Sequence, residues 1–169
     1  MNNLLRSIEH SLQTGNHYAA LAMALALPDI CGWVEDPNSH SKPRYIKWFE
    51  KYLQRKYTLQ ATDIRPEHIF LKGSDCYALR CAYLHEGRED ISEQRAQEAL
   101  EAFQFVVTPE GWTVHMNQTN NTLQLQVDIF CREVVEGATQ FLSDMSNNPE
   151  ATARLAQRLL IRDINGQPI

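Results

Sequence analysis

Residues 17–27 read HYAALAMALAL, an apolar run that stops at Pro28-Asp29. The run is too short to cross a bilayer, which takes about 20 apolar residues. Its apolar side chains would surround a helix on nearly all sides, and its alanines permit close approach of neighbouring helices. We therefore expect a buried helix at the centre of the fold, beginning near Asn16. Pro28 removes one backbone donor and is expected to kink or break it.

Apolar residues recur at helical spacing on both sides of this central run. Leu4, Leu5, Ile8 and Leu12 predict a first helix that ends at Gly15-Asn16. Further helices are predicted over residues 43–57, from residues 73–75 to Gly87 with Ser74 or Asp75 as the N-terminal cap, from about residue 128 to residue 146, and over about 149–161.

Between residues 103 and 127 the apolar period changes from helical to two, which is typical of strands. The alternating residues are Phe103, Phe105 and Val107, then Trp112, Val114 and Met116 after a turn at 109–111, and finally Leu123, Leu125 and Val127. The sequence thus predicts a mainly α single domain over residues 1–169. It is a helical bundle with a small antiparallel β-hairpin or three-strand insertion, at about 103–127, before the last long helices.

The overall charge is acidic, with 16 Lys and Arg against 21 Asp and Glu and a net charge of −5. Hydrophobic residues at 43% and charged residues at 22% exclude disorder, and the net charge excludes indiscriminate coating of nucleic acid. This net charge is the sum over a chain that contains one strongly basic and one strongly acidic segment. Residues 42–57 carry six basic side chains and one acidic, whereas residues 86–101 carry two basic and six acidic.

The four cysteines form no CxxC pair, and the N-terminal residues lack the apolar core of a signal peptide. We therefore expect a cytoplasmic protein with reduced thiols, not attached to a membrane.

The segment YALRCAYLHEG, residues 77–87, contains the candidate chemistry. Arg80 and His85 lie about 140° apart around a helix and about 7.5 Å apart along it, so the long arginine side chain has to reach along a groove to meet the histidine. Arginine binds phosphate oxygens, and histidine exchanges protons near neutral pH. The pair suits metal-independent RNA cleavage, with Tyr77 and Cys81 as possible support on the face of His85. The alternative is an ordinary helix end, where a histidine complements the helix dipole.

A basic stripe in the predicted helix over residues 43–57 is a second candidate. Arg44, Lys47, Lys51 and Arg55 follow one another at spacings of three, four and four. They suit a track for RNA phosphates beside Arg80 and His85. Alternatively, the stripe pairs with the acidic segment 86–101, within the chain or across a dimer, while the aromatic residues of the same helix fill the core.

Other groupings are less specific. Cys76, Cys81 and His85 invite a zinc site, but only Cys81 and His85 share a face and no further ligands are at hand, so no metal or cofactor is predicted. Cys81 and His85 are also spaced for cysteine nucleophile chemistry, although a buried thiol is the commoner role. His115 and Asn117 form a lesser candidate pair on a predicted strand.

The segment YALRCAYLHEG resembles the R-x4–6-H signature of the HEPN superfamily, in which a helical bundle carries the arginine and histidine on a late core helix. The chain also resembles a bacterial family of uncharacterised HEPN-like proteins, over most of residues 18–142. The segments that carry this likeness are ALPDICGWVE (26–35), RYIKWFEKYL (44–53), DCYALRCAYLHEG (75–87) and NQTNNTLQLQVDIFC (117–131).

The resemblance implies a homodimer whose paired motif helices line a shared cleft, and endoribonuclease activity. The chemistry of the Arg–His pair implies 2′,3′-cyclic phosphate ends. The resemblance assigns the phosphate contact to Arg80 and general acid–base catalysis to His85. The residue after the arginine is commonly polar in active members, typically asparagine, whereas this chain has Cys81. Other members bind nucleotides or act as scaffolds, so the alternative is a non-catalytic dimeric interaction, regulatory or nucleotide-binding module with an unidentified protein partner.

Overall fold

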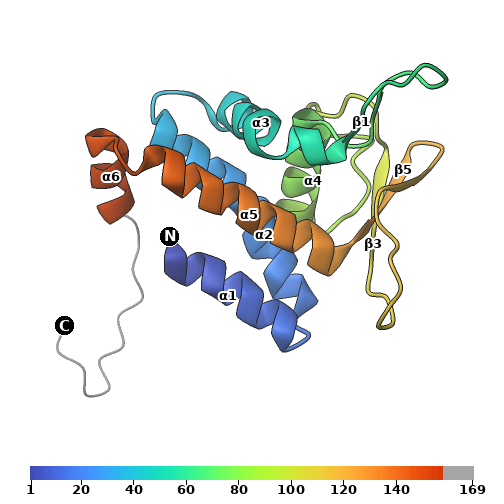
Figure 1. Ribbon diagram of the computed structural model, residues 1–169, viewed down its shortest axis with the longest axis horizontal. Helices are drawn as coiled ribbons and strands as arrows, with labels where there is room; N and C mark the ends of the chain where they lie inside the picture. Colours follow the sequence, from blue (N-terminus) through green and yellow to red (C-terminus); the bar gives the residue numbers. More distant parts are fainter. Residues whose placement is uncertain (158–169) are drawn as a thin grey trace.

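The computed structural model describes residues 1–157 and is mainly helical, as the sequence predicts (Figure 1). The helices and strands are α1 (Asn2–Gln13), α2 (His17–Glu35), α3 (Ser41–Tyr52), the 3₁₀ helix η1 (Gln54–Tyr57), β1 (Thr58–Leu59), β2 (His68–Ile69), α4 (Gly73–Glu86), β3 (Ala102–Val106), β4 (Asn117–Thr119), β5 (Thr122–Gln126), α5 (Val127–Met145) and α6 (Pro149–Ala156).

Helix α2 occupies the centre of the fold and packs against α1, α3, α4, α5 and α6. The prediction that Pro28 breaks this helix is wrong, because α2 continues through Pro28 to Glu35. One lost backbone hydrogen bond is outweighed by burial, since Pro28 and its neighbour Leu27 lie in the core. The extra turns bring Asp29 and Glu35 into a helix that also contacts α3 and α4.

At 19 residues, α2 is long and apolar enough to span a membrane by composition alone. The argument that the run is too short therefore fails. The conclusion that it is a core helix holds, because half of its apolar window is buried inside the protein against five other helices.

Helix α3 is shorter than predicted. It ends at Tyr52, and the chain tightens into η1 before β1. The aromatic side chains of this region fill the core as expected, with Tyr45, Trp48, Phe49 and Tyr57 fully buried. Arg55 therefore lies on η1, and the basic stripe does not continue along a single helix.

Helix α4 begins at Gly73 and ends at Glu86, where Gly87 takes the left-handed conformation with φ 68°. That end was predicted from the glycine. The predicted N-terminal cap is wrong, because neither Ser74 nor Asp75 caps the helix. Asp75 is instead buried within the first turn, and its Oδ1 accepts hydrogen bonds from the backbone nitrogens of Glu98 and Ala99.

The insertion is three-stranded, in the order β3-β5-β4, but it is not wholly antiparallel. β3 pairs with β5 in parallel, and only β4 runs antiparallel to β5. Residues 112–116 form no strand. In this segment, hydrogen bonds to side chains take the place of backbone hydrogen bonds between strands. Val114 N donates to Gln126 Oε1, and Gln126 N donates to His115 Nδ1.

The last two helices follow the prediction closely. Helix α5 runs across the bundle from the sheet, and α6 begins at Pro149 with Asn148 as its cap. The predicted continuation to Ile161 lies outside the described residues.

Candidate functional site

Arg80 and His85 meet near the C-terminal end of α4. Nη1 of Arg80 lies 3.3 Å from Nε2 of His85. Because a guanidinium only donates, Nε2 of His85 is the acceptor in this contact. His85 is exposed, whereas Arg80 is half-buried. The structure thus brings together the two residues that helical spacing placed on different faces, through the length of the arginine side chain.

Arg80 lies on aromatic and sulfur neighbours from its own helix. Its guanidinium carbon is 5.9 Å from the ring centroid of Tyr77, and Nη1 is 3.9 Å from Sγ of Cys81. Tyr77 in turn packs edge-on against Tyr45, with the two ring centroids 5.3 Å apart. Both predicted supporting residues, Tyr77 and Cys81, therefore contact the arginine.

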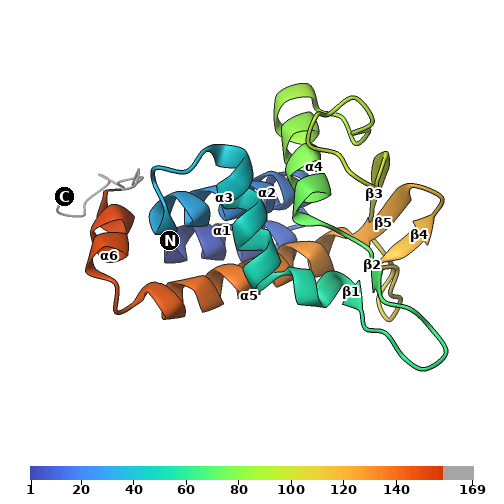
Figure 2. The same cartoon turned by 90° about the horizontal axis from the view of Figure 1, so that it is seen from above.

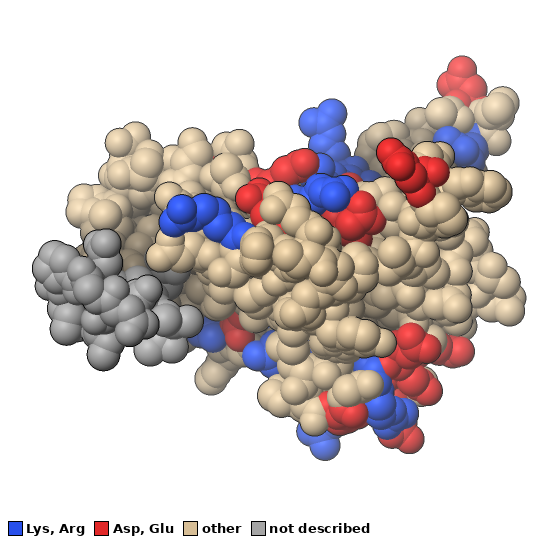
Figure 3. Space-filling view, turned by 90° about the horizontal axis from the view of Figure 1, so that it is seen from below, with Lys and Arg blue, Asp and Glu red and all other residues tan. Residues whose placement is uncertain are grey.

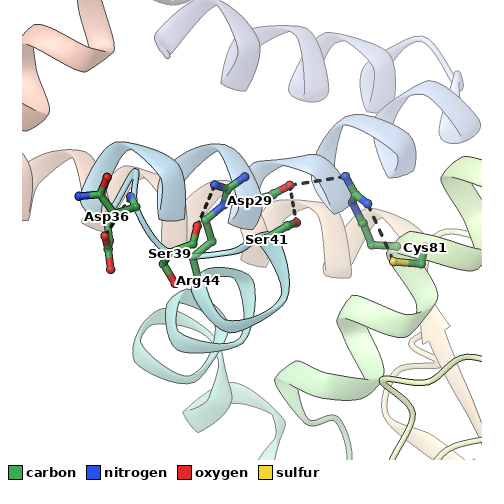
Figure 4. Close-up of polar contacts among 8 residues, drawn as sticks. Asp29, Asp36, Ser39, Ser41, Arg44 and Cys81 are labelled. Carbon is green, nitrogen blue, oxygen red and sulfur yellow. Dashed lines mark hydrogen bonds and ion pairs between the residues drawn. The ribbon is translucent and has the colours of Figure 1, made fainter.

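An aspartate from α2 links Arg80 to α3 (Figure 4). Oδ2 of Asp29 lies 3.5 Å from Nη2 of Arg80 and accepts a hydrogen bond from Oγ of Ser41 at 3.0 Å. The other carboxylate oxygen, Oδ1, accepts from Nε of Arg44 at 2.6 Å. Arg44 also donates from Nη1 to the carbonyl of Ser39. One carboxylate thus joins two guanidinium groups on two helices.

Asp29 and Ser41 are the site residues that the sequence reasoning missed. The signal was present, because Asp29 is the one Asp, Glu, Lys or Arg in α2 before Glu35. A carboxylate on a mostly buried helix requires a cationic partner. The sequence reasoning took Pro28-Asp29 only as the stop of the apolar run and assigned Asp29 no partner.

The basic stripe is divided in the structure. Arg44 turns inward to Asp29, with a side chain only 19% exposed. Nζ of Lys47 and Nζ of Lys51 both lie 3.6 Å from Glu35 Oε1 at the end of α2, and Arg55 is exposed on η1. The carboxylates of α2, and not those of segment 86–101, are therefore the ion-pair partners of Arg44, Lys47 and Lys51.

The acidic segment 86–101 makes ion pairs of its own. Arg88 contacts Glu86, Asp90 and Glu93 within the segment, and Lys72 pairs with Glu98 at 3.0 Å. Figure 3 shows basic and acidic side chains interspersed on the face seen from below, with no continuous basic band there.

Tyr45 and Cys76 form a buried contact at the helix that carries Arg80. Oη of Tyr45 lies 3.4 Å from Sγ of Cys76, and burial raises the pKa of Tyr45 well above its usual value and that of Cys76 to about 12. Among residues 1–157, no three His, Cys, Asp or Glu side chains are grouped to hold a metal ion.

The lesser candidate pair is separated. His115 turns inward, with Nε2 3.4 Å from Oε2 of Glu133 and its ring 5.9 Å from that of Tyr57. Asn117 lies exposed on β4 and donates to Gln124. His115 therefore belongs to an internal cluster with Tyr57 and Glu133, which is a structural role.

No protein-family model, curated protein or solved structure matches this chain. Its function has to be inferred from its own side chains, above all Arg80 and His85.

Proposed function

We propose that this protein is a HEPN-like, metal-independent endoribonuclease that acts as a homodimer. The observation that carries the proposal is the 3.3 Å contact between Arg80 Nη1 and His85 Nε2 at the exposed end of α4. A permanent cation and a titratable base at one point would suffice for RNA transesterification.

The two residues have distinct roles in this reaction. His85 acts as the general base and takes the proton from the ribose 2′-hydroxyl. The 2′-oxygen then bonds to phosphorus and the bond to the 5′-oxygen breaks. The protonated His85 gives its proton to the leaving 5′-oxygen and returns to its neutral form. Arg80 neutralises the charge that develops on the phosphate oxygens. The products are a 2′,3′-cyclic phosphate and a 5′-hydroxyl.

The proposed dimer would pair two α4 ends. In Figure 2 the end of α4 projects beyond the neighbouring helices, and Leu84 is 37% exposed beside His85. Two such ends across a two-fold axis would place two Arg80–His85 pairs along one RNA cleft. Light scattering of the purified protein at several concentrations measures this association directly.

The activity test is incubation of the protein with mixed RNAs in the presence of a chelator. Cleavage is expected, with cyclic phosphate ends, and Arg80→Ala and His85→Ala should each abolish it. The matched controls are Arg65→Ala and His10→Ala, which remove an exposed arginine and an exposed histidine outside the site. Cleavage that survives Arg80→Ala or His85→Ala, or no cleavage of any RNA by the wild-type protein, contradicts the proposal.

A second candidate is a non-catalytic module that binds nucleotides or a protein partner. The contact between Arg80 and Asp29 favours it, since a guanidinium that already faces a carboxylate is less available to a phosphate. Cys81 after the arginine favours it as well. Thermal-shift measurements with nucleotides separate this candidate, because a ligand that binds only the folded state raises the melting temperature without RNA cleavage.

A further inference from the structure

Besides its contacts with Tyr77 and Cys81, the Arg80 guanidinium faces two further groups. Nη2 faces Asp29 of α2 at 3.5 Å, and Nη1 faces His85 at 3.3 Å. Nε of Arg80 is buried and makes no hydrogen bond. The two terminal nitrogens are therefore the groups that determine where the guanidinium plane points.

Asp29 is itself held in place by α3. Ser41 and Arg44 each donate to one of its carboxylate oxygens, at 3.0 Å and 2.6 Å, and the Asp29 side chain is 15% exposed. A carboxylate fixed by two other donors is a rigid anchor rather than a mobile counter-ion. Asp29 carries one negative charge against the two positive charges of Arg44 and Arg80, so a net positive charge remains for a phosphate.

We propose that Asp29 is a positioning residue for the site assigned under the proposed function: it fixes Arg80 so that Nη1 faces His85 and the phosphate that would bind there. The proposal rests on that assigned function for its catalytic consequence. The hold of Asp29 on Arg80 is a separate property of the protein that requires no RNA.

Arginine-directed modification measures this hold directly. Phenylglyoxal reacts with accessible guanidinium groups, and peptide mass spectrometry gives a rate for each arginine. Arg80 is expected to react slowly in the wild-type protein and several-fold faster in Asp29→Asn. Asp29→Glu keeps the charge and should restore slow modification in part.

Two internal controls separate this effect from unfolding. Arg154 is 17% exposed and bonded to the carbonyl of Val34, more than one turn along α2 from Asp29, so its rate should not change. Glu35→Gln removes the other carboxylate of α2, which pairs with Lys47 and Lys51, and should leave the Arg80 rate unchanged. An unchanged Arg80 rate in Asp29→Asn overturns the proposal. An equal rise at Arg154 also overturns it, because Asp29 would then support the fold in general.

The catalytic consequence is measured on any RNA that the wild-type protein cleaves. Asp29→Asn should lower kcat by about tenfold to a hundredfold, the cost of a misplaced catalytic group, while KM changes little. A raised KM at constant kcat contradicts positioning and indicates a role in binding alone. If the wild-type protein cleaves no RNA, the proposed function fails, and the phenylglyoxal rates still decide whether Asp29 holds Arg80.

Discussion

Gly32 of α2 and Arg44 of α3 lie so close that a Cβ atom placed on Gly32 would be 2.9 Å from the carbonyl oxygen of Arg44. This backbone approach is what allows Asp29, one turn earlier on α2, to reach the Arg44 side chain. The contact between the two helices and the charge cluster beside Arg80 therefore depend on the same glycine.

Gly32→Ala is expected to destabilise the protein, although alanine is usually the better helix former. The new methyl group would meet backbone atoms that cannot move independently of α3, at a cost of about 1–3 kcal/mol. Urea denaturation measures the change in the free energy of unfolding. Gly137→Ala is the control, since its Cβ would meet side-chain atoms, Cδ2 of Leu53 at 3.0 Å and Cη2 of Trp48 at 3.2 Å, rather than backbone, and should cost less. If Gly137→Ala lowers the free energy of unfolding more than Gly32→Ala does, the contact between Gly32 and the Arg44 backbone is not the tighter of the two.

The Tyr57–Glu133–His115 cluster makes stability dependent on pH. Burial raises the pKa of Glu133, but hydrogen bonds from His115 and Tyr57 outweigh it, so the pKa of this carboxyl lies below its usual value. A carboxyl whose pKa is lower in the folded protein stabilises the fold above its unfolded pKa of about 4.3, and this contribution is lost as the pH falls through the folded value. Glu133→Gln should therefore cost about 1–3 kcal/mol at neutral pH, and progressively less in acid.

Denaturation in urea over a series of pH values measures this dependence. The control is Glu136→Gln, one turn further along α5. It neutralises a carboxylate whose side chain is 65% exposed, so it should change the free energy of unfolding little at any pH. A cost of Glu133→Gln that is equal at all pH values would mean that the shape of the side chain matters and its charge does not.

Thiol chemistry is expected to single out Cys81. The other three cysteines, Cys31, Cys76 and Cys131, are buried, and burial raises the pKa of Cys76 and of Cys131 to about 12. A thiol reagent such as dithionitrobenzoate should therefore modify one thiol rapidly in the native protein and all four after denaturation. Cys81→Ser should remove the rapid phase. Persistence of that phase in the variant would show that the core opens at another cysteine.

The helices and the core were largely predictable from the sequence, whereas the partners of the site residues were not. Period and turn residues placed α1, α4 and α5 because these signals are local. The expected break at Pro28 did not occur because α2 packs against five other helices, and Asp29 therefore lies on a helix beside Arg80. The parallel pairing of β3 with β5 was missed because strand order depends on a long connection that leaves no local pattern.

The ion-pair partners of the basic stripe were likewise not predictable from the sequence. Spacing correctly placed Arg44, Lys47 and Lys51 on one helix but gave no indication that Asp29 and Glu35 of α2 would be their partners. Ion pairs between helices depend on crossing geometry, which a sequence pattern does not contain.

Arg154 of α6 is expected to hold the C-terminal helix onto α2. Its Nε donates to the carbonyl of Val34 at 2.7 Å and its Nη2 to that of Glu35 at 3.4 Å, at the helix end where carbonyls lack intrahelical partners. Arg154→Ala should cost about 1.5–3 kcal/mol, because two hydrogen bonds from a charged donor are lost. Hydrogen exchange should rise in α6 before the core helices are affected.

Glu150→Ala is the matched control for this helix contact. Glu150 lies 3.5 Å from Nη1 of Arg154 but is 83% exposed, so its loss should cost less than about 1 kcal/mol. Two outcomes would contradict a capping role for Arg154. The first is that Glu150→Ala lowers the free energy of unfolding as much as Arg154→Ala does, which would mean that the exposed ion pair dominates. The second is that hydrogen exchange in α6 is unchanged in Arg154→Ala, which would mean that apolar contacts alone hold α6.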